Sequence, residues 1–417
     1  MRRSALVTTG AACAAMLAAL PLAGCGANSG AGSGGSSAIK IGIVTSLTGQ
    51  ASAGFTGVEE GAKARLSASK EEPGACTRDI QVVMADDTST PQGALSATQK
   101  LVRQDKVFAL LPVSSFFYGA GQYAGTQAKE TPVLGAGFDG GKQWLNKDYR
   151  NLFNAIGNVD NENISSAMGT YWKSIGGTKA AAVAFDTPSA SAAALANIES
   201  AERAGLQRGY VNVKVPFGSK DVGSLVLGIK NSGADVLYLP VTPETAFAVV
   251  GGLKQARVEL KSVILATGYG ADLLKSEPAV RAAQGIGFST SVAPMEIPTP
   301  GGQAMSAALQ KYAGATTKLP SFSQSMGWLT TDLLLHGLKK AGCDASQSEL
   351  IDALRDSKDW TANGLYPRPH DFTKYGDLAS GQGPGNCFFV SILRGREFQT
   401  DPKAKPICGT LLGKVKR

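Results

Sequence analysis

The sequence predicts an α/β protein built from two doubly wound parallel-sheet lobes. Short runs rich in β-branched and apolar residues alternate with segments in which apolar residues recur at helical spacing. This alternation occupies the first third of the chain and begins again at residue 179. The composition, 43% hydrophobic and 18% charged, is globular, and the 417 residues suffice for two lobes.

The first half contains its elements in the order that predicts a parallel sheet. Residues 39–46 (IKIGIVTS) form a β-branched run, and residues 58–69 place Val58, Ala62 and Leu66 at helical spacing. The remaining predictions are strand 80–85 (IQVVMA), helix 92–104, strand 107–111 and a strand over 132–134. This βαβαβ order implies parallel strands with helices on both faces.

The second half repeats the pattern. Its predicted elements are strand 179–185 (KAAAVAF), helix 190–204, strand 210–215, helix 222–232, strand 235–239, helix 243–256 and strand 262–266. A long Leu-rich helix over 326–341 and a hairpin over 387–398, turning around Arg394-Gly395, follow. The two α/β halves therefore stand in tandem.

The N-terminus has the layout of an export signal. Arg2 and Arg3 precede an apolar stretch over 11–22, and small residues lead to Cys25. The stretch is shorter than the roughly 20 residues that a membrane-spanning helix needs. We interpret 1–24 as a signal peptide, Cys25 as a lipidation site of the bacterial lipobox kind, and the Gly/Ser-rich residues up to 38 as a flexible tether. The alternative is an ordinary signal peptide with an incidental cysteine.

Charge and cysteine content argue against several classes of partner and site. The net charge is +8, or 8 − 2 = +6 without Arg2 and Arg3, and the basic residues are scattered except in the last few residues. A nucleic-acid partner would need a concentrated basic face, so we expect none. Four cysteines remain in the exported chain, which allows two disulfides in three pairings. The sequence contains no C-x-x-C motif, which would indicate a zinc or thioredoxin-type site, and we expect neither metal nor cofactor.

Residues 135–141 read GAGFDGG and match the G-x-G-x-x-G spacing of a dinucleotide-binding loop. Such a loop should open directly into a helix and meet an acidic residue about 20 positions later. Here residues 142–147 do not open directly into a well-formed helix but lead, through Asp148, out of this half of the chain. The P-loop pattern is not met either, because Ala136 occupies its first glycine position and Gln143 replaces its Ser or Thr. A nucleotide site is therefore disfavoured, which leaves either a surface turn or a loop that faces a small ligand.

Several short matches resemble the leucine/isoleucine/valine-binding family of type I periplasmic solute-binding proteins, which serve ABC transporters. Their order along the chain carries the resemblance: Ile41-Gly42-Ile43, Ser46-Leu47-Thr48-Gly49, Gly61-Ala62, Asp86-Asp87, Lys100-Leu101-Val102, Pro112-Val113-Ser114-Ser115, Thr131-Pro132-Val133, Phe185-Asp186 and Gly337-Leu338-Lys339-Lys340-Ala341-Gly342.

The resemblance implies two lobes joined by three crossings of the chain. We expect these crossings near 153–160, 286–294 and 364–372. The first lobe would then comprise 39–155 and 290–363, and the second 156–289 and 364–417. Because a bridge between lobes would obstruct a hinge, the resemblance favours disulfides Cys76 with Cys343 and Cys387 with Cys408.

Candidate ligand-binding residues follow from their position after strands, where open parallel sheets bind ligands. In the first lobe they are Leu47, Thr48, Gly54, Phe55, Ser114, Ser115, Phe116, Phe117, Tyr118, Gly137, Phe138 and Asp139. In the second they are Asp186, Ser189, Thr242, Glu244 and Tyr269. Hydroxyls can hold a carboxylate or amide oxygen, and the aromatic rings can enclose an apolar group, although residues 116–118 are equally consistent with core packing.

The candidate site departs from that of the amino-acid binders. The acid that usually pairs with a ligand's ammonium on the second lobe is replaced by Gly268-Tyr269-Gly270, and the usual aromatic of the preceding loop by Val241 and Thr242. Asp139 could supply the negative charge. Otherwise the ligand lacks an α-ammonium, as an amide or carboxylic acid does.

The expected function is capture of a small solute by hinge closure and delivery to an ABC permease. The protein would be a monomer, anchored by lipid to the outer face of the bacterial cytoplasmic membrane. A sensing receptor subunit on the same scaffold is an alternative. An enzyme is disfavoured: the two histidines, His336 and His370, lie outside any G-x-S-x-G or H-E-x-x-H motif, and adjacent Asp86 and Asp87 on a strand point to opposite faces.

Overall fold

The computed structural model describes residues 38–156, 163–374, 386–400 and 404–415. The predicted signal peptide, the lipid site at Cys25 and nearly all of the predicted tether lie outside these residues. Ser37–Arg417 form one compact unit. It contains a five-stranded and an eight-stranded sheet, which we call the first and second sheets, and a two-stranded pair of β6 (Asn163–Ser165) and β15 (Leu411–Lys414). Among the described residues, no helix is both long and apolar enough to cross a membrane.

The first sheet has five parallel strands in the order β2-β1-β3-β4-β5. They are β1 (Ile39–Thr45), β2 (Ile80–Asp86), β3 (Ala109–Leu110), β4 (Val133–Gly135) and β5 (Leu152–Asn154). Parallel sheets are covered on both faces, so their central strands are apolar on both sides. Along β1, Ile39, Ile41 and Ile43 pack into one core and Val44 into the other.

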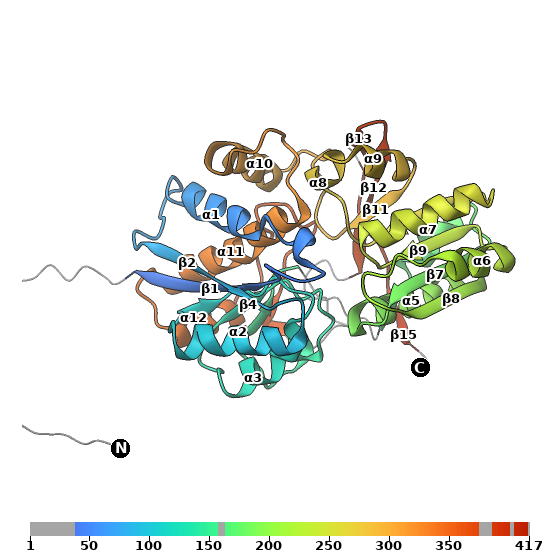
Figure 1. Ribbon diagram of the computed structural model, residues 1–417. Helices are drawn as coiled ribbons and strands as arrows, with labels where there is room; N and C mark the ends of the chain where they lie inside the picture. Colours follow the sequence, from blue (N-terminus) through green and yellow to red (C-terminus); the bar gives the residue numbers. More distant parts are fainter. Residues whose placement is uncertain (1–37, 157–162, 375–385, 401–403, 416–417) are drawn as a thin grey trace, which may run out of the picture. The chain divides into compact units, whose positions relative to one another are not determined.

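Helices cover both faces of the first sheet (Figure 1). One core includes α1 (Val58–Ser69), α10 (Pro300–Ala313), α11 (Phe322–Ala341) and α12 (Gln347–Arg355); the other includes α2 (Pro91–Arg103) and α3 (Gly121–Thr126). Helices α1 and α11 approach closely because glycine occupies their contact. A Cβ at Gly327 would collide with the backbone of Val58, and one at Gly61 with the backbone of Gln324.

The second sheet follows the order β13-β12-β11-β10-β9-β7-β8. Its parallel strands are β7 (Lys179–Phe185), β8 (Gln207–Val215), β9 (Val236–Leu239), β10 (Ser262–Leu265) and β11 (Gly287–Thr290). The hairpin β12 (Cys387–Arg394) and β13 (Glu397–Gln399) extends it antiparallel. One core contains α4 (Ala167–Ser174) and α5 (Pro188–Arg203); the other contains α6 (Gly223–Ser232), α7 (Pro243–Gln255), α8 (Ala271–Leu274) and α9 (Glu277–Ala282).

Local sequence sets several helix starts. Helices α2, α5 and α10 each begin with Thr followed by Pro, and the threonine hydroxyl accepts a hydrogen bond from a backbone N–H of the first turn. Helix α11 begins at Phe322 because Ser321 and Gln324 form a capping box. It therefore starts one turn before the predicted 326–341. All the predicted strands and helices are present, although β3 has only two residues against the five expected for 107–111.

The chain passes between the two sheets three times. The first passage follows β5, and part of the predicted 153–160 segment lies outside the described residues. The second begins after β11, whose Gly287–Thr290 are fully part of the second sheet, and ends at α10. The third comes after Phe372, later than the predicted 364–372. Leu365, Tyr366 and Phe372 belong to the first core, where the Tyr366 hydroxyl donates to the carbonyl of Ala155 at 2.5 Å.

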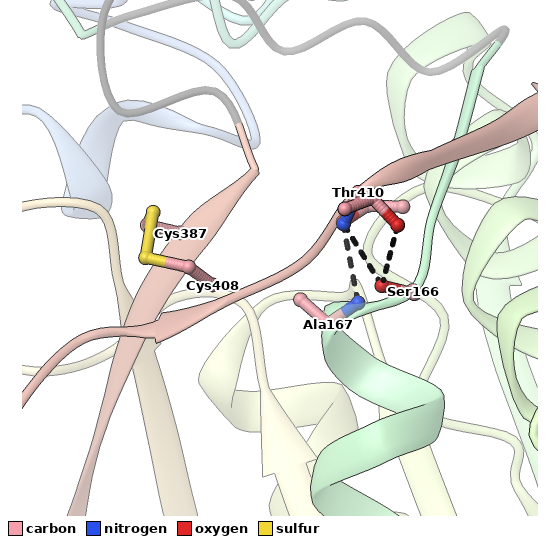
Figure 2. Close-up of a disulfide and its surroundings, with 6 residues drawn as sticks. Ser166, Ala167, Cys387, Cys408 and Thr410 are labelled. Carbon is pink, nitrogen blue, oxygen red and sulfur yellow. Dashed lines mark hydrogen bonds between the residues drawn. A yellow bond between two sulfur atoms is a disulfide. The ribbon is translucent and has the colours of Figure 1, made fainter.

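Both disulfides join the cysteines that the family resemblance implied. Cys76 bonds Cys343, next to α11, and Cys387 bonds Cys408. The second bond links β12 to β14 (Ile407–Cys408), where the two cysteines face each other across an antiparallel pair (Figure 2). Each bridge therefore stays within the region of one sheet.

Candidate functional site

Each sheet has a topological switch point, the place where open α/β sheets bind ligands. In the first sheet, β2 lies on one side of β1, and β3 and the later strands lie on the other side. The switch point is therefore between β1 and β3. In the second sheet it lies between β7 and β9 for the same reason. The loops at the carboxyl ends of these strands contain most of the residues that the sequence singled out.

Two carboxylates hold the loops around the first switch point. The buried Asp87 accepts hydrogen bonds from the hydroxyls of Ser46 and Ser114 and from the N–H of Ser89. Burial outweighs these bonds and raises the pKa of Asp87. The Ser114 hydroxyl also accepts from the N–H of Phe116 at 2.9 Å. Ser114 was expected to contact ligand, but it is fully buried and its hydroxyl is already engaged.

Asp86 organises the loop after β1. It accepts from the N–H groups of Leu47 and Thr48 and from the Thr48 hydroxyl, at 2.9, 3.2 and 2.5 Å. Partial burial raises the pKa of Asp86, but the hydrogen bonds from Thr48, Thr88 and Leu47 together lower it below the ordinary value. Leu47 and Thr48 remain exposed, as does Gly54, so this loop offers surface at the switch point.

The glycine-rich loop after β4 is braced from within. Asp139, 1% exposed, accepts from the Trp144 indole at 2.6 Å, the Gln143 amide at 2.8 Å and the N–H of Gly141 at 3.3 Å. Burial outweighs these bonds and raises the pKa of Asp139 to about 6. Gly137, also buried, donates to the side chain of Asn154. The hypothesis that Asp139 offers its charge to a ligand does not fit, because the carboxylate points inward to these three donors.

The element after the glycine-rich loop also differs from that of a dinucleotide site. It is η3 (Lys142–Leu145), a single turn of 3-10 helix, and not an α-helix. Gly140 has φ of 69°, a backbone conformation that favours glycine. A Cβ at Gly140 would also meet Ser189, at 2.7 Å from its side chain. The glycines therefore serve a tight turn and a close approach.

Aromatic rings gather at the same edge. Phe138, partly exposed, stacks on the buried Phe55 with ring centroids 6.0 Å apart and lies 5.8 Å from Phe322, the first residue of α11. Phe116 contacts Phe217, which follows β8, at 5.7 Å. We call Phe55, Phe116, Phe138, Phe217 and Phe322 the aromatic cluster. It collects rings that follow β1, β3, β4 and β8, together with the first residue of α11.

Two other aromatics of the predicted set behave differently. Phe117 is 1% exposed and packs on Trp144 in a core of the first sheet, which agrees with the core-packing alternative for residues 116–118. Tyr118 is partly exposed, and its pKa is raised by burial and, secondly, by the charge of Asp139. Ser115 is likewise partly exposed.

Residues of the second sheet reach the same edge. The Ser189 hydroxyl donates to the carbonyl of Phe138 at 2.7 Å, which joins the start of α5 to the glycine-rich loop. Asp186 is exposed and forms an ion pair with Lys214 at 3.0 Å. Thr242 precedes α7 without capping it through its side chain. Glu244, in the first turn of α7, is exposed and has no hydrogen-bond or ion-pair partner among the described residues.

Tyr269 has a structural role that the sequence did not indicate. Its hydroxyl donates to Glu296 at 3.0 Å and accepts from the N–H of Met295 at 2.7 Å. Glu296 also accepts from Ser391 at 3.0 Å and from Thr400. Burial raises the pKa of Glu296, and burial together with the Glu296 charge raises that of Tyr269. Tyr269 therefore anchors the second passage to the second sheet, and its hydroxyl is engaged by Glu296 and Met295.

Three residues of this edge were missed from sequence: Phe217, Phe322 and Glu296. Phe217 directly follows the carboxyl end of β8, so the rule that selected the other candidates would have found it. Phe322 and Glu296 lie far along the chain from the loops they contact, and no local signal places them there. Within the described residues, no three His, Cys, Asp or Glu side chains gather closely enough to hold a metal ion.

Comparisons with known proteins identify the family to which the chain belongs. The sequence model of the family described as periplasmic binding protein matches residues 38–395. A solute-binding protein of an ABC transporter from R. palustris, in complex with benzoate, is similar with a TM-score of 0.69 and 19% identity over 91% of this chain and 96% of that one. A search of curated proteins finds no match.

Two further solved structures resemble the chain. The leucine-binding protein LivK from Thermotoga maritima has a TM-score of 0.68 and 17% identity, covering 87% of this chain and 98% of its own. A fatty acid ABC transporter substrate-binding protein from Thermomonospora curvata has a TM-score of 0.66 and 18% identity, covering 91% and 92%. With the family model spanning most of its length, this chain belongs to the periplasmic binding proteins, with the type I fold of those that bind small ligands for ABC transporters.

Proposed function

We propose that this protein is exported, anchored by a lipid on Cys25 to the outer face of the bacterial cytoplasmic membrane, and delivers a small solute to an ABC permease. The family supports the transport role. The basic start, short apolar stretch and small residues before Cys25 support export and anchoring. The Gly/Ser-rich residues that follow provide the length for the binding domain to reach its partner.

The solute that best fits the edge is a small acid with an apolar, preferably aromatic, body. The aromatic cluster is the observation that carries this proposal, because its partly exposed rings, Phe138, Phe217 and Phe322, suit a flat apolar group. Phe138 packs on the buried ring of Phe55, and Phe217 on the buried ring of Phe116. The first turn of α7 begins with a proline and lacks a side-chain cap, so its free N–H groups can receive a carboxylate. The benzoate held by the R. palustris relative agrees with this class.

A branched-chain amino acid is the second candidate, and Glu244 is the observation that favours it. Asp86, Asp87 and Asp139 are engaged by internal donors, and Asp186 is paired with Lys214. Glu244 is open by contrast, and its carboxylate could pair with a ligand's ammonium. Glu244→Gln would then abolish binding of leucine but leave benzoate binding intact.

Closure around the solute would proceed by bending at the three passages between the sheets. The loops after β1, β3 and β4 would contact the solute first, and those after β7 and β9 would complete the site. The solute shifts the balance only by the difference between its affinities for the closed and open forms. The permease would recognise the closed form.

The test is a thermal-shift and calorimetric screen of residues 37–417 against benzoate, 4-hydroxybenzoate, leucine, isoleucine and leucinamide. A bound compound at 100 times its Kd should stabilise the fold by about 2.7 kcal/mol. We expect the aromatic acids to stabilise and Phe138→Ala to weaken their binding about 10- to 100-fold, as loss of a buried ring implies. The control, Leu227→Ala, changes a 57% exposed residue on α6 and should have no effect. Stabilisation by a nucleotide alone would contradict the proposal.

Asp139→Asn separates a loop-organising role from a charge-pairing one. We expect this variant to bind the solute as tightly as the wild type does, because an amide can still accept from Trp144. Asp139→Ala removes the acceptor of three donors and should cost about 2–3 kcal/mol of unfolding free energy. Urea denaturation and calorimetry at pH 8 would measure both effects. A large loss of affinity in Asp139→Asn, with stability retained, would instead assign the carboxylate to the ligand's ammonium.

A further inference from the structure

The last described residues connect two segments that are far apart in the sequence, β12 of the second sheet and the short strand before α4. Within residues 404–414, which we call the C-terminal brace, β14 pairs antiparallel with β12 and carries Cys408 of the second disulfide. Three residues further on, β15 (Leu411–Lys414) pairs antiparallel with β6 (Asn163–Ser165). Figure 2 shows the brace running from the disulfide to the start of α4.

Hydrogen bonds to the backbone of the brace hold it in place along its length. The N–H of Gly409 donates to the carbonyl of Asn386 at 2.7 Å. The N–H of Thr410 donates to the Ser166 hydroxyl at 2.9 Å, and the N–H of Ser166 returns a bond to the carbonyl of Thr410 at 2.9 Å (Figure 2). From α5, the Arg203 guanidinium donates to the carbonyl of Leu412 at 2.9 Å.

The middle of the brace also leaves no free space. A Cβ at Gly409 would lie 2.6 Å from the Ser165 hydroxyl and 2.9 Å from the Ser166 hydroxyl. Only glycine therefore allows the brace to pass this close to the start of α4. The position of the brace is fixed by shape as well as by hydrogen bonds.

The two ends of the brace lie at the two places where the chain arrives in the second core. Strand β6 is the first described element after β5 of the first sheet, and it leads into α4, whose Met168 and Trp172 are core residues. Asn386 and Cys387 are the first described residues after Lys374, and they lead into β12. We call these the two arrival segments. They are remote in sequence, and the brace contacts both.

We propose that the C-terminal brace couples the two arrival segments, so that β6 with the start of α4 and the start of β12 move as one body. This rests on the proposed function, since hinge closure is the motion that such coupling would serve. The β12–β14 pairing involves only two residues on each strand, which is too short to persist unaided. The Cys387–Cys408 bond restricts the intervening chain and thereby holds the brace in place.

Hydrogen–deuterium exchange of residues 37–417 without ligand tests the proposal. Cys387→Ser with Cys408→Ser should reduce protection of the amides of 163–174 by about tenfold or more, because local opening becomes easier. The matched control is Cys76→Ser with Cys343→Ser, which removes the other bridge and should leave 163–174 unchanged. Unchanged protection in the first variant, or an equal loss in both, would overturn the proposal.

A milder variant guards against global unfolding. Ser166→Ala leaves both disulfides intact and removes only the acceptor for Thr410, so it should raise exchange in 411–414 and 163–166 with the two cores unaffected. Exchange confined to 411–414 would contradict coupling. Because no solute is used, failure of the solute screen leaves these results intact, and failure here leaves the transport role intact.

Discussion

Replacing Asp332 with alanine is expected to lower the free energy of unfolding by about 3–5 kcal/mol, the typical cost of breaking a buried ion pair. Asp332 on α11 accepts from the Arg65 guanidinium of α1 at 2.7 Å and from the Trp360 indole at 2.8 Å. The side chains of Arg65 and Asp332 are only 9% and 12% exposed. Alanine would leave a buried cation with a weaker partner and a buried N–H with none.

Urea denaturation of the variant and of a matched control measures this effect. Asp352 on α12 pairs with Arg150 at 2.9 Å, but both side chains are largely exposed, at 64% and 65%. Asp352→Ala should therefore cost less than about 1 kcal/mol. Asp332→Asn keeps an acceptor for Trp360 and should fall between the two. An equally small loss in Asp332→Ala and Asp352→Ala would show that this pair contributes little.

The second large effect is acid destabilisation through His370. The imidazole is 1% exposed and lies among the rings of Trp360, Tyr366 and Phe372, with centroids 4.7, 4.5 and 5.7 Å away. Burial lowers the pKa of His370 to about 3 from an ordinary value of 6.5. The folded protein therefore keeps this histidine neutral, while the unfolded chain binds a proton below pH 6.5.

Stability should consequently be constant above pH 6.5 as far as His370 is concerned, and should fall as the pH drops from 6.5 toward 3. By pH 4.5 the loss from this residue is about 2.5 kcal/mol. His370→Phe should flatten the decline, as measured by urea denaturation at a series of pH values. The pKa of His336 is also lowered, mainly by burial, so His336→Gln is the control that should leave the His370 component in place. Equal slopes for the wild type and His370→Phe would show that the histidine is not buried in solution.

Much of the fold could be predicted because its signals are local. The spacing of Val58, Ala62 and Leu66 and the β-branched run of β1 report their own periodicity. The pattern failed where these signals are weak. Helix α10 is rich in Gly and Ala and was not predicted, although a Thr-Pro pair stands at its start. The start of α11 was placed one turn too late, because the Ser321–Gln324 capping box that begins it at Phe322 lies before the predicted 326–341.

The rule that selected the candidate residues places them after strands, but it does not tell which way their side chains face. Placing residues after strands brought Phe55, Phe116, Phe138 and Ser189 to one edge, since parallel strands share their carboxyl ends. The same rule also selected Ser114, Phe117, Asp139 and Tyr269, whose side chains face inward. A sequence shows that a polar residue follows a strand, but not which donors its side chain will meet.

The alternation of strands and helices, the presence of two large, mainly parallel sheets and the positions of the loops at the switch points were determined by the sequence itself, because hydrophobic periodicity and turn residues act over a few neighbours. Tertiary structure alone decided that Asp139 accepts from Trp144 and Gln143, that Glu296 fastens Tyr269, and that the C-terminal brace contacts β6. These contacts form because each buried polar group needs a hydrogen-bond partner, and the partner is whichever group the fold brings close in space.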